Sequence, residues 1–222
     1  MNTLELFAGS GSFSKIAKEN NYNTLTIDIE NKFNPDVCID ILNYEDNNKY
    51  NIIWASIPCQ AFSIASCSTH FNIDKSPKSD FAKKSILLMD KTLSIIKNNL
   101  DNNGVWFIEN PRGLMRKILP QKLKENNIDF IQYTIWYCQY GDDRAKPTDI
   151  WTNLKGFQPK ICKNNSISCN HQRAPRGSKT GTQGRSNAFE RSKIPSKLIK
   201  EFIELNKELI IKEDKNEKNN NY

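Results

Sequence analysis

The sequence lacks any segment that would direct the chain to export, and it lacks an apolar run long enough to cross a bilayer. Its first residues do not follow the charged, apolar and small-residue order of a signal peptide. A membrane-spanning helix needs roughly 20 predominantly apolar residues in a row, and the chain has no such run. We therefore expect a cytoplasmic protein that does not associate with membranes.

Disulfides are not expected either, although the chain has six cysteines. Disulfides persist in oxidising compartments, and a chain without an export signal stays in a reducing one. The cysteines are better interpreted as free thiols, metal ligands or a nucleophile. Cys162, Cys169 and His171 could begin a zinc site that Cys138 or Cys67 completes.

Acidic residues are scarce in residues 171–200, where Glu190 is the single acid, and the whole chain has a formal net charge of +7. The basic residues of this stretch are Arg173, Arg176, Lys179, Arg185, Arg191, Lys193, Lys197 and Lys200. This charge favours a polyanionic partner, with a solvated polar loop as the alternative. We expect the loop from 173 to 193 to hold a phosphate backbone, through Arg173, Arg176, Lys179 and Arg185.

The length of 222 residues fits one α/β domain, and short apolar runs alternate with helical patterns as in a mostly parallel sheet with helices on both faces. Helices are expected from about Phe81 to Asn99 and from about Pro195. Strands are expected at Thr3–Phe7, Thr24–Asp28, Val37–Ile39, Asn51–Ser56, Val105–Glu109, Ile131–Tyr137 and Asp149–Thr152.

The chain divides into four parts on this interpretation. Residues 1–153 form the main domain, 154–193 a small basic insert, 194–212 a helix that returns to the main domain, and 213–222 a disordered tail. No feature of the sequence sets the oligomeric state, so self-association stays open.

A turn with two glycines follows the first expected strand, in the segment Leu4–Phe13. Glycines let backbone amides approach a ligand, and the helix start that follows offers unpaired donors to an anion. The turn lacks the third glycine of the dinucleotide fingerprint and the lysine of a P-loop, so an ordinary tight turn is the alternative. Asp28 ends the next strand and is placed to hold ribose hydroxyls. Asp40 follows a third strand and could reach an adenine amino group, with Ile41 packing on the ring.

Two further residues whose side chains could take part in a reaction lie at the ends of buried strands. Cys59 follows Pro58 at the end of one strand and precedes a polar loop from Gln60 to Asp80 that is long enough to act as a lid. Glu109 ends another strand. Because parallel strands share one carboxyl edge, we expect the glycine turn, Asp28, Cys59 and Glu109 to converge on one crevice. A thiol and a carboxylate beside a nucleotide-like cofactor suggest covalent attack assisted by a proton donor.

Three motifs in this order resemble those of the cytosine-C5 DNA methyltransferases. They are Leu-Phe-Ala-Gly-Ser-Gly from Leu6, Pro-Cys-Gln-Ala-Phe-Ser from Pro58 and Glu-Asn-Pro-Arg-Gly from Glu109. The resemblance spans Asn2 to about Asn153, with a return at Ile194 to Ile203. It implies a Rossmann-like fold that binds S-adenosylmethionine and methylates C5 of cytosine in DNA.

The resemblance also assigns roles to individual residues. Cys59 would be the nucleophile that adds to C6, and Glu109 would engage N3 of the base. Arg144, in a region similar to the family's Gln-x-Arg-x-Arg motif, would act at the base and the active-site loop. Gln60 and Ser63 would contact DNA. The cofactor would bind to Phe7, Ala8, Gly9, Gly11, Asp28, Asp40 and Ile41.

The chain departs from the family between its last two motifs, where only about forty residues replace a substantial target recognition domain. Compact versions of this kind resemble phage or prophage orphan methyltransferases. Methylation of RNA cytosine by the same chemistry stays open, and so does a catalytically silent nucleic-acid-binding relative.

Overall fold

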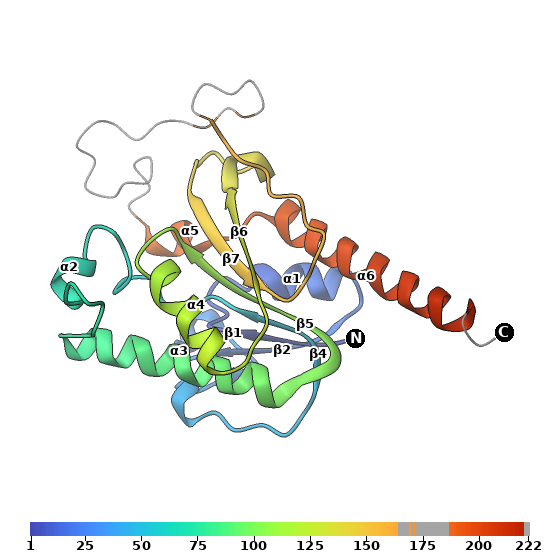
Figure 1. Ribbon diagram of the computed structural model, residues 1–222, viewed down its shortest axis with the longest axis horizontal. Helices are drawn as coiled ribbons and strands as arrows, with labels where there is room; N and C mark the ends of the chain where they lie inside the picture. The colour runs from blue at the N-terminus through green and yellow to red at the C-terminus, as the bar shows by residue number, and fades with distance from the viewer. Residues whose placement is uncertain (164–168, 170, 172–186, 220–222) are drawn as a thin grey trace.

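The computed structural model describes residues 1–163, 169, 171 and 187–219 (Figure 1). Within them, a seven-stranded sheet has the order β3-β2-β1-β4-β5-β7-β6. The strands are β1 (Asn2–Leu6), β2 (Asn23–Asp28), β3 (Val37–Cys38), β4 (Tyr50–Ala55), β5 (Leu100–Pro111), β6 (Ile131–Trp136) and β7 (Pro147–Thr152). The α/β fold with a mostly parallel sheet, predicted from the alternating pattern, is confirmed.

The directions of the strands determine at which edge of the sheet a ligand site can form. Strands β1 to β5 pair in parallel, whereas β7 runs antiparallel to both β5 and β6. The chain order reverses between β1 and β4, and ligands of open α/β sheets bind at such a switch point, beyond the carboxyl ends of the strands. The ends of β1, β2, β4 and β5 therefore share one edge.

Helices cover both faces of the sheet (Figure 1). One face carries α3 (Asp80–Asn99) and α4 (Met115–Glu125), and the other carries α1 (Ser12–Glu19) and α6 (Ser196–Asn219). The period of two along β4 explains the two cores: Ile53 and Ala55 pack toward α3, whereas Ile52 and Trp54 pack toward α1 and α6. The short helices are η1 (Asn31–Phe33), η2 (Ile41–Asn43), α2 (Cys67–His70), η3 (Tyr137–Tyr140) and α5 (Ala188–Ser192).

Aromatic rings fix α1 and α6 on the sheet. The Trp54 ring stacks on Phe13 of α1 at 5.4 Å between centroids and on Phe107 of β5 at 5.2 Å. Phe202 of α6 lies 4.8 Å from Phe107. These buried ring contacts join α6 to β5, and each ring pair contributes roughly 0.5–1.5 kcal/mol beyond burial itself.

Two sequence-based boundaries are wrong. β5 begins at Leu100 and not at Val105. Helix α6 continues through Asn219, whereas a disordered tail was expected from Glu213. Residues 213–219 are rich in Lys and Glu, which favour helix, and they extend a helix already nucleated by packed residues. Among the helices described here, none combines the length and apolarity needed to cross a membrane.

Candidate active site

The turn after β1 has the backbone shape that close approach to a ligand requires. Phe7, Gly9 and Gly11 all have positive φ values, of 57°, 47° and 62°. A Cβ atom on Gly11 would lie 2.9 Å from Oγ of Ser14, so a side chain there would displace that hydroxyl and strain the left-handed backbone. The amide of Gly11 closes the turn by donating to the carbonyl of Ala8 at 2.7 Å.

The start of α1 differs from the expectation of unpaired donors. The buried carboxyl of Glu5 accepts hydrogen bonds from the amides of Phe13 at 3.1 Å and Ser14 at 2.9 Å. These two donors are therefore satisfied within the protein. Burial raises the pKa of Glu5 to about 7, against the hydrogen bonds from α1, which lower it.

Asp28 is held by the backbone of the glycine turn. Its Oδ2 accepts from the amide of Gly9 at 2.8 Å, and its Oδ1 accepts from the amide of Glu30 at 2.8 Å. A carboxylate oxygen has capacity for more than one donor, so these bonds leave room for ribose hydroxyls. The neighbouring Ile29 is 58% exposed, an apolar surface that the sequence interpretation missed.

Asp40 and Ile41 lie at the start of η2. Asp40 accepts from the amide of Leu42 at 3.1 Å and pairs with Lys84 at 2.9 Å, and the Lys84 contact lowers the Asp40 pKa. Ile41 is only 4% exposed and belongs to the core under α3. The predicted packing of Ile41 on an adenine ring would need that core to open, whereas Ile29 is already exposed.

Hydrogen bonds hold the loop that carries Cys59 in place both before and after this residue. Before Cys59, the amide of Ser56 donates to the carbonyl of Leu6 at 3.2 Å, and the buried Asn110 side chain donates to the carbonyl of Ile57 at 2.7 Å. After it, Phe62 is fully buried, and its carbonyl accepts from the amide of Leu114 at 2.8 Å. The thiol is thereby fixed at the carboxyl edge of the sheet.

Glu109 of β5 lies together with Tyr137 of η3 and Lys146, which directly precedes β7. The hydroxyl of Tyr137 donates to Oε1 of Glu109 at 2.7 Å, and Nζ of Lys146 lies 3.7 Å from the same oxygen. The Lys146 ammonium also lies 4.6 Å from the centre of the Tyr137 ring. Burial, followed by the charge of Glu109, raises the Tyr137 pKa well above its usual value, so Tyr137 keeps its proton and acts as a donor.

The charges of this group shift the pKa of the Cys59 thiol. Burial raises the pKa of its thiol, and the Glu109 carboxylate raises it further, whereas Lys146 and Arg191 lower it. The structure therefore brings Cys59 and Glu109 to the same edge, as the strand order predicted. It also adds Tyr137 and Lys146, which the sequence interpretation missed. Lys146 follows Arg144 by two residues in the segment that resembles the Gln-x-Arg-x-Arg motif, and that spacing was the available signal.

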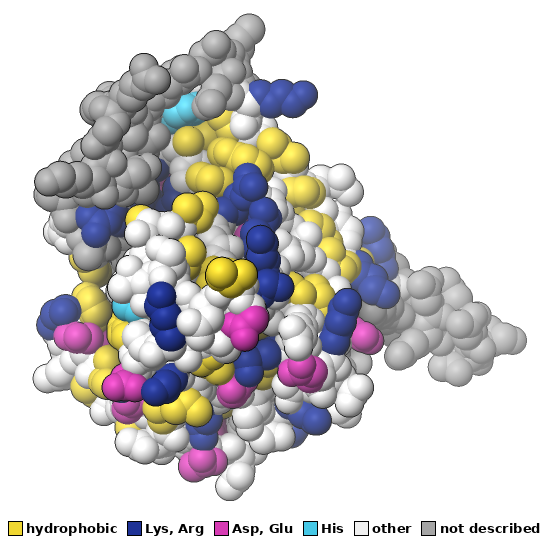
Figure 2. Space-filling view, turned by 60° about the vertical axis from the view of Figure 1, so that its left-hand side comes forward, with side chains coloured by type: hydrophobic (Ala, Val, Ile, Leu, Met, Phe, Trp, Pro, Cys, Tyr) yellow, Lys and Arg dark blue, Asp and Glu magenta, His cyan; other side chains and the backbone are white. Residues whose placement is uncertain are grey.

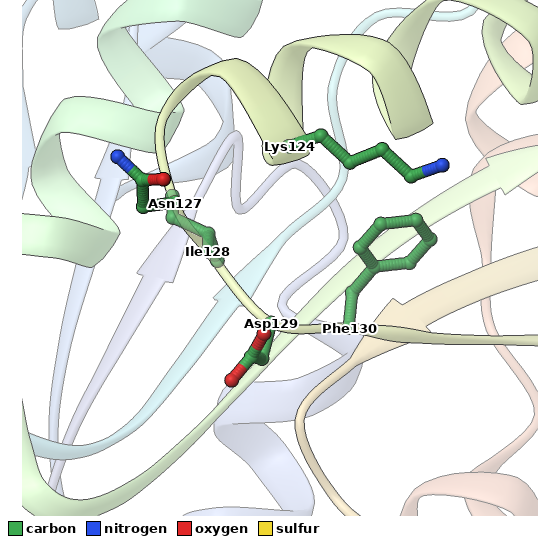
Figure 3. A pocket seen from close by; sticks show the side chains of 5 residues that line it. All are labelled: Lys124, Asn127, Ile128, Asp129 and Phe130. Atoms are coloured by element: carbon green, nitrogen blue, oxygen red, sulfur yellow. The ribbon is translucent and has the colours of Figure 1, made fainter.

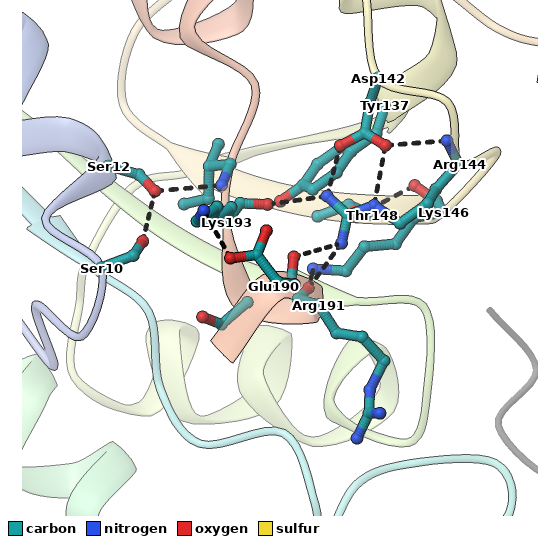
Figure 4. Close-up of polar contacts among 12 residues, drawn as sticks. Ser10, Ser12, Tyr137, Asp142, Arg144, Lys146, Thr148, Glu190, Arg191 and Lys193 are labelled. Carbon is teal, nitrogen blue, oxygen red and sulfur yellow. Dashed lines mark hydrogen bonds and ion pairs between the residues drawn. The ribbon is translucent and has the colours of Figure 1, made fainter. Parts of the chain in front are cut away.

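Arg144 does not present a free guanidinium to this edge (Figure 4). Its side chain is 1% exposed and forms a bidentate ion pair with Asp142. Burial of Asp142 disfavours its charge, but the hydrogen bonds from Arg144 outweigh that effect and lower the Asp142 pKa. The remaining Arg144 donors bind the carbonyls of Glu190, Arg191 and Lys193 at 2.9–3.2 Å. The structure thus gives Arg144 a positioning role.

The segment that Arg144 holds continues to the glycine turn (Figure 4). The amide of Ile194 donates to Oγ of Ser12 at 3.1 Å, and this hydroxyl lies 2.7 Å from the hydroxyl of Ser10. The segment that ends at Ile194 therefore lies against one side of the glycine turn.

The loop predicted as a lid is folded rather than open. It contains α2, the stacked rings of Phe62 and Phe71 at 5.5 Å, and a 2.8 Å hydrogen bond between His70 and Ser79. Gln60 is exposed and Ser63 half-buried, so both can be reached from outside. The predicted phosphate-binding residues Arg173, Arg176, Lys179 and Arg185 lie outside the described residues.

The predicted zinc ligands meet in the structure. Cys162, Cys169 and His171 lie together with Cys138, and their ligand atoms are all within 4.8 Å of one another. Cys67 does not belong to this group. Of the two cysteines considered for the fourth position, the structure selects Cys138.

A separate hollow lies at the opposite edge of the sheet (Figure 3). It sits where α4 leads into β6 and is lined by Lys124, Asn127, Ile128, Asp129 and Phe130. None of the residues predicted to act in chemistry lines it, so it contributes nothing to the site described above.

The strand order, the reversed β7 and the glycine turn after β1 define a Rossmann-like fold of the kind found in S-adenosylmethionine-dependent methyltransferases. Among solved structures, the Dnmt2 methyltransferase of S. pombe matches with a TM-score of 0.50 and 16% sequence identity over 74% of this chain. A methyltransferase of Entamoeba histolytica matches with a TM-score of 0.48 and 18% identity over 73% of this chain. The chain spans 57% of the length of each of these proteins.

One curated relative matches along nearly the whole chain. It is a protein of Frog virus 3 named a probable DNA (cytosine-5)-methyltransferase, 26% identical over 225 residues. The match covers 92% of this chain and 100% of the relative, so the two proteins are of similar size. No family model matches the sequence.

Proposed function

We propose that the chain is a DNA (cytosine-5)-methyltransferase that transfers a methyl group from S-adenosylmethionine to C5 of cytosine. The observation that carries this proposal is that Cys59, in the loop after β4, and Glu109, near the carboxyl end of the neighbouring parallel strand β5, share the sheet edge with the glycine turn after β1. The similarity to the Frog virus 3 protein, along 92% of this chain, supports the same activity.

The residues at the edge of β1 and β2 fit an adenosyl cofactor. In the turn from Phe7 to Gly11, the two glycines let the backbone come close to a ligand. Asp28 can accept further hydrogen bonds, and the apolar side chain of Ile29 is exposed. Asp40 lies at the end of the next strand. When bound here, S-adenosylmethionine would supply an electrophilic methyl group from its sulfonium.

Cys59 and Glu109 would make C5 of the target cytosine nucleophilic. The sulfur of deprotonated Cys59 forms a bond to C6, while Glu109 holds N3 through a shared proton, so that the electron pair of the C5–C6 double bond becomes available at C5. Once C5 carries the methyl group, a base removes its original proton, the C5–C6 double bond re-forms and the sulfur leaves. Sulfur suits both steps because it is a strong nucleophile and an adequate leaving group.

Tyr137 and Lys146 would tune this chemistry. Tyr137 is a fixed donor to Glu109, which keeps the carboxyl in one orientation. Lys146 carries a half-buried positive charge 3.7 Å from Glu109, and its charge lowers the Cys59 pKa, which favours the thiolate that attacks C6. A cation at this place also offsets negative charge that develops on the base during addition.

The target base has to leave the duplex, because C6 is inaccessible in stacked DNA. Cationic residues near the mouth of the site support contact with phosphates. Arg112 is exposed just beyond β5, and Arg191 lies close enough to lower the Cys59 pKa. In the space-filling view most acidic side chains gather in the lower half, whereas Lys and Arg also occupy the upper part (Figure 2). The insert at 154–193 would stand in place of a target recognition domain, as in a compact phage-like enzyme.

The test follows labelled methyl from S-adenosylmethionine into nucleic acid. Duplex DNA and tRNA are offered side by side to the wild type and to Cys59→Ala. We expect label in DNA with the wild type alone, and a covalent adduct with DNA that contains 5-fluorocytosine. Label in tRNA only would favour the RNA methyltransferase, and cofactor-independent DNA binding without label would favour a silent binding protein.

A further inference from the structure

Three cysteines and a histidine from two distant parts of the chain meet beside the end of β6. Cys138 belongs to η3, whereas Cys162, Cys169 and His171 belong to the insert. Cys138 and Cys162 are buried, and Cys169 and His171 are half-buried. The described part of the chain forms no other group of this composition, and none of the four takes part in the chemistry proposed above.

The spacing of their ligand atoms matches a tetrahedral metal site. The sulfur atoms of Cys162 and Cys169 are 3.5 Å apart, and Nδ1 of His171 lies 3.6 Å from the first and 3.3 Å from the second. Zinc bonds of about 2.3 Å to sulfur and about 2.0 Å to nitrogen separate tetrahedral ligands by about 3.8 Å (sulfur to sulfur) and about 3.5 Å (sulfur to nitrogen). A disulfide would instead need sulfur atoms about 2.0 Å apart.

We propose that Cys138, Cys162, Cys169 and His171 bind one zinc ion in a closed structural site. Three thiolates and one imidazole complete a tetrahedral shell, which leaves no position for water or substrate. A structural site of this kind stabilises the fold around it, because the ligands are gathered only in the folded chain.

The segment that leads to Cys162 is held in place by contacts that do not involve the four ligands. The carbonyl of Lys160 accepts from the amide of Trp136 at 3.3 Å, and the amide of Lys160 donates to the hydroxyl of Tyr140 at 3.1 Å. The Lys160 side chain pairs with Glu201 of α6. Cys162 therefore lies next to Cys138 because of the fold, and the metal would bond Cys169 and His171 to this pair.

The four ligands lie between the turn that contains Tyr137 and the basic part of the insert. Cys138 directly follows Tyr137, whose hydroxyl is bonded to Glu109. Cys169 and His171 lie where the chain enters the most basic part of the insert. Zinc would thus join the start of that basic segment to the turn that supports the candidate catalytic carboxyl.

The test measures metal directly on the full-length protein, purified with a reductant and without chelator. We expect about one zinc ion per chain by elemental mass spectrometry. After replacement by Co²⁺, we expect the intense visible bands of tetrahedral cobalt and the near-ultraviolet charge-transfer band of thiolate ligands. These measurements do not use methyl transfer, so their outcome is independent of the proposed activity.

Variants locate the ion. The double substitution Cys162→Ser and Cys169→Ser should lower the bound zinc at least tenfold and abolish the cobalt spectrum. Cys38→Ser, which changes an exposed cysteine on β3, should leave both unchanged. The proposal is overturned if the wild type holds neither zinc nor tetrahedral cobalt, if the double variant keeps the spectrum, or if protein from reducing conditions carries a Cys162 to Cys169 disulfide. Should the double variant not fold, the two wild-type measurements decide.

Discussion

The hydroxyl of Tyr137 donates a 2.7 Å hydrogen bond to Oε1 of Glu109, and both side chains are buried. This bond joins η3 to the end of β5, although β7 lies between β5 and β6 in the sheet. It gives the candidate catalytic carboxyl one orientation before any base arrives. Pre-set orientation of this kind reduces the reorganisation needed during reaction.

Removal of this donor should slow methyl transfer without unfolding the protein. In Tyr137→Phe, Glu109 loses a hydrogen bond to a charged group, worth about 1.5–3 kcal/mol, which corresponds to about a 10- to 100-fold lower kcat. The KM for S-adenosylmethionine should stay within about twofold, since Tyr137 does not belong to the glycine turn. Steady-state transfer of labelled methyl measures both constants.

Tyr133→Phe is the matched control. It removes a hydroxyl from β6, the strand that leads into η3, and this hydroxyl donates to the carbonyl of Leu154 at 3.2 Å, away from Glu109. Equal losses of kcat in the two variants would show that the Tyr137 bond has no special role.

The charge of Lys146 should control how readily Cys59 ionises. Because Lys146 lowers the Cys59 pKa and Glu109 raises it, Lys146→Met should move the pH dependence of Cys59 alkylation to higher pH, and Glu109→Gln should move it to lower pH. Lys146→Arg keeps the charge and should stay near the wild type. The measurement is the iodoacetamide rate at Cys59 against pH, read by peptide mass spectrometry.

Lys84→Met controls for a general change of surface charge, since Lys84 pairs with Asp40. Its profile should overlay that of the wild type. A shift of the same sign in Lys146→Met and Glu109→Gln would contradict the electrostatic account.

Gly113 lets the Cys59 loop approach the end of β5. A Cβ atom on Gly113 would lie 2.4 Å from the carbonyl oxygen of Phe62, which is closer than any real contact, and that oxygen already accepts from Leu114. Gly113→Ala should therefore displace the loop, lower stability by about 1–3 kcal/mol and reduce both methyl transfer and Cys59 alkylation. Denaturant unfolding and the alkylation rate report the two effects.

Gly156→Ala separates loop displacement from general destabilisation. Gly156 has a φ of 85°, and an added Cβ would meet only Leu205, at 4.0 Å. The backbone strain should lower stability by about 1 kcal/mol while Cys59 reactivity stays unchanged. A loss of reactivity in this variant equal to that of Gly113→Ala would refute the loop explanation.

Arg144 should be needed for the order of the segment at 190–194. Its guanidinium binds Asp142 and three backbone carbonyls, and a lysine cannot form this planar array. Arg144→Lys should lower stability by about 2–4 kcal/mol and weaken the binding of S-adenosylmethionine, because Ile194 then loses its fixed contact with Ser12 beside the glycine turn. Unchanged cofactor binding in a folded Arg144→Lys variant would contradict this positioning role. Calorimetry with S-adenosylmethionine provides the measurement.

Local sequence was sufficient for the residues that end buried strands. Cys59 and Glu109 follow short β-rich runs, and parallel strands share one carboxyl edge, so their meeting could be predicted without coordinates. Tyr137, Lys146 and Cys138 could not be placed in this way, because the antiparallel β7 decides which side chains of η3 face Glu109 or the insert. Helix α4 escaped prediction as well, since Pro120 lies inside it and interrupts the helical signal.

The buried carboxyl of Glu5 should make stability depend on pH in an unusual direction. Its pKa is about 7 in the folded chain against 4.5 as the ordinary value. Below pH 4.5 the carboxyl is protonated in both states, and between 4.5 and 7 only the folded chain holds the proton. The stabilising contribution is therefore complete at low pH and is lost as pH rises through the folded pKa, by about 3 kcal/mol as an order of magnitude.

Glu5→Gln removes this titration while keeping one acceptor for the amides of Phe13 and Ser14. The NH2 of the glutamine side chain would face a backbone N–H, so the variant should be less stable than the wild type at pH 5. The gap should narrow toward pH 8, because the wild type then carries a buried charge and Glu5→Gln does not. Denaturant unfolding at several pH values measures the gap, with the surface change Glu125→Gln as control. A gap that widens with pH would mean that the α1 amides stabilise the Glu5 anion more than burial opposes it.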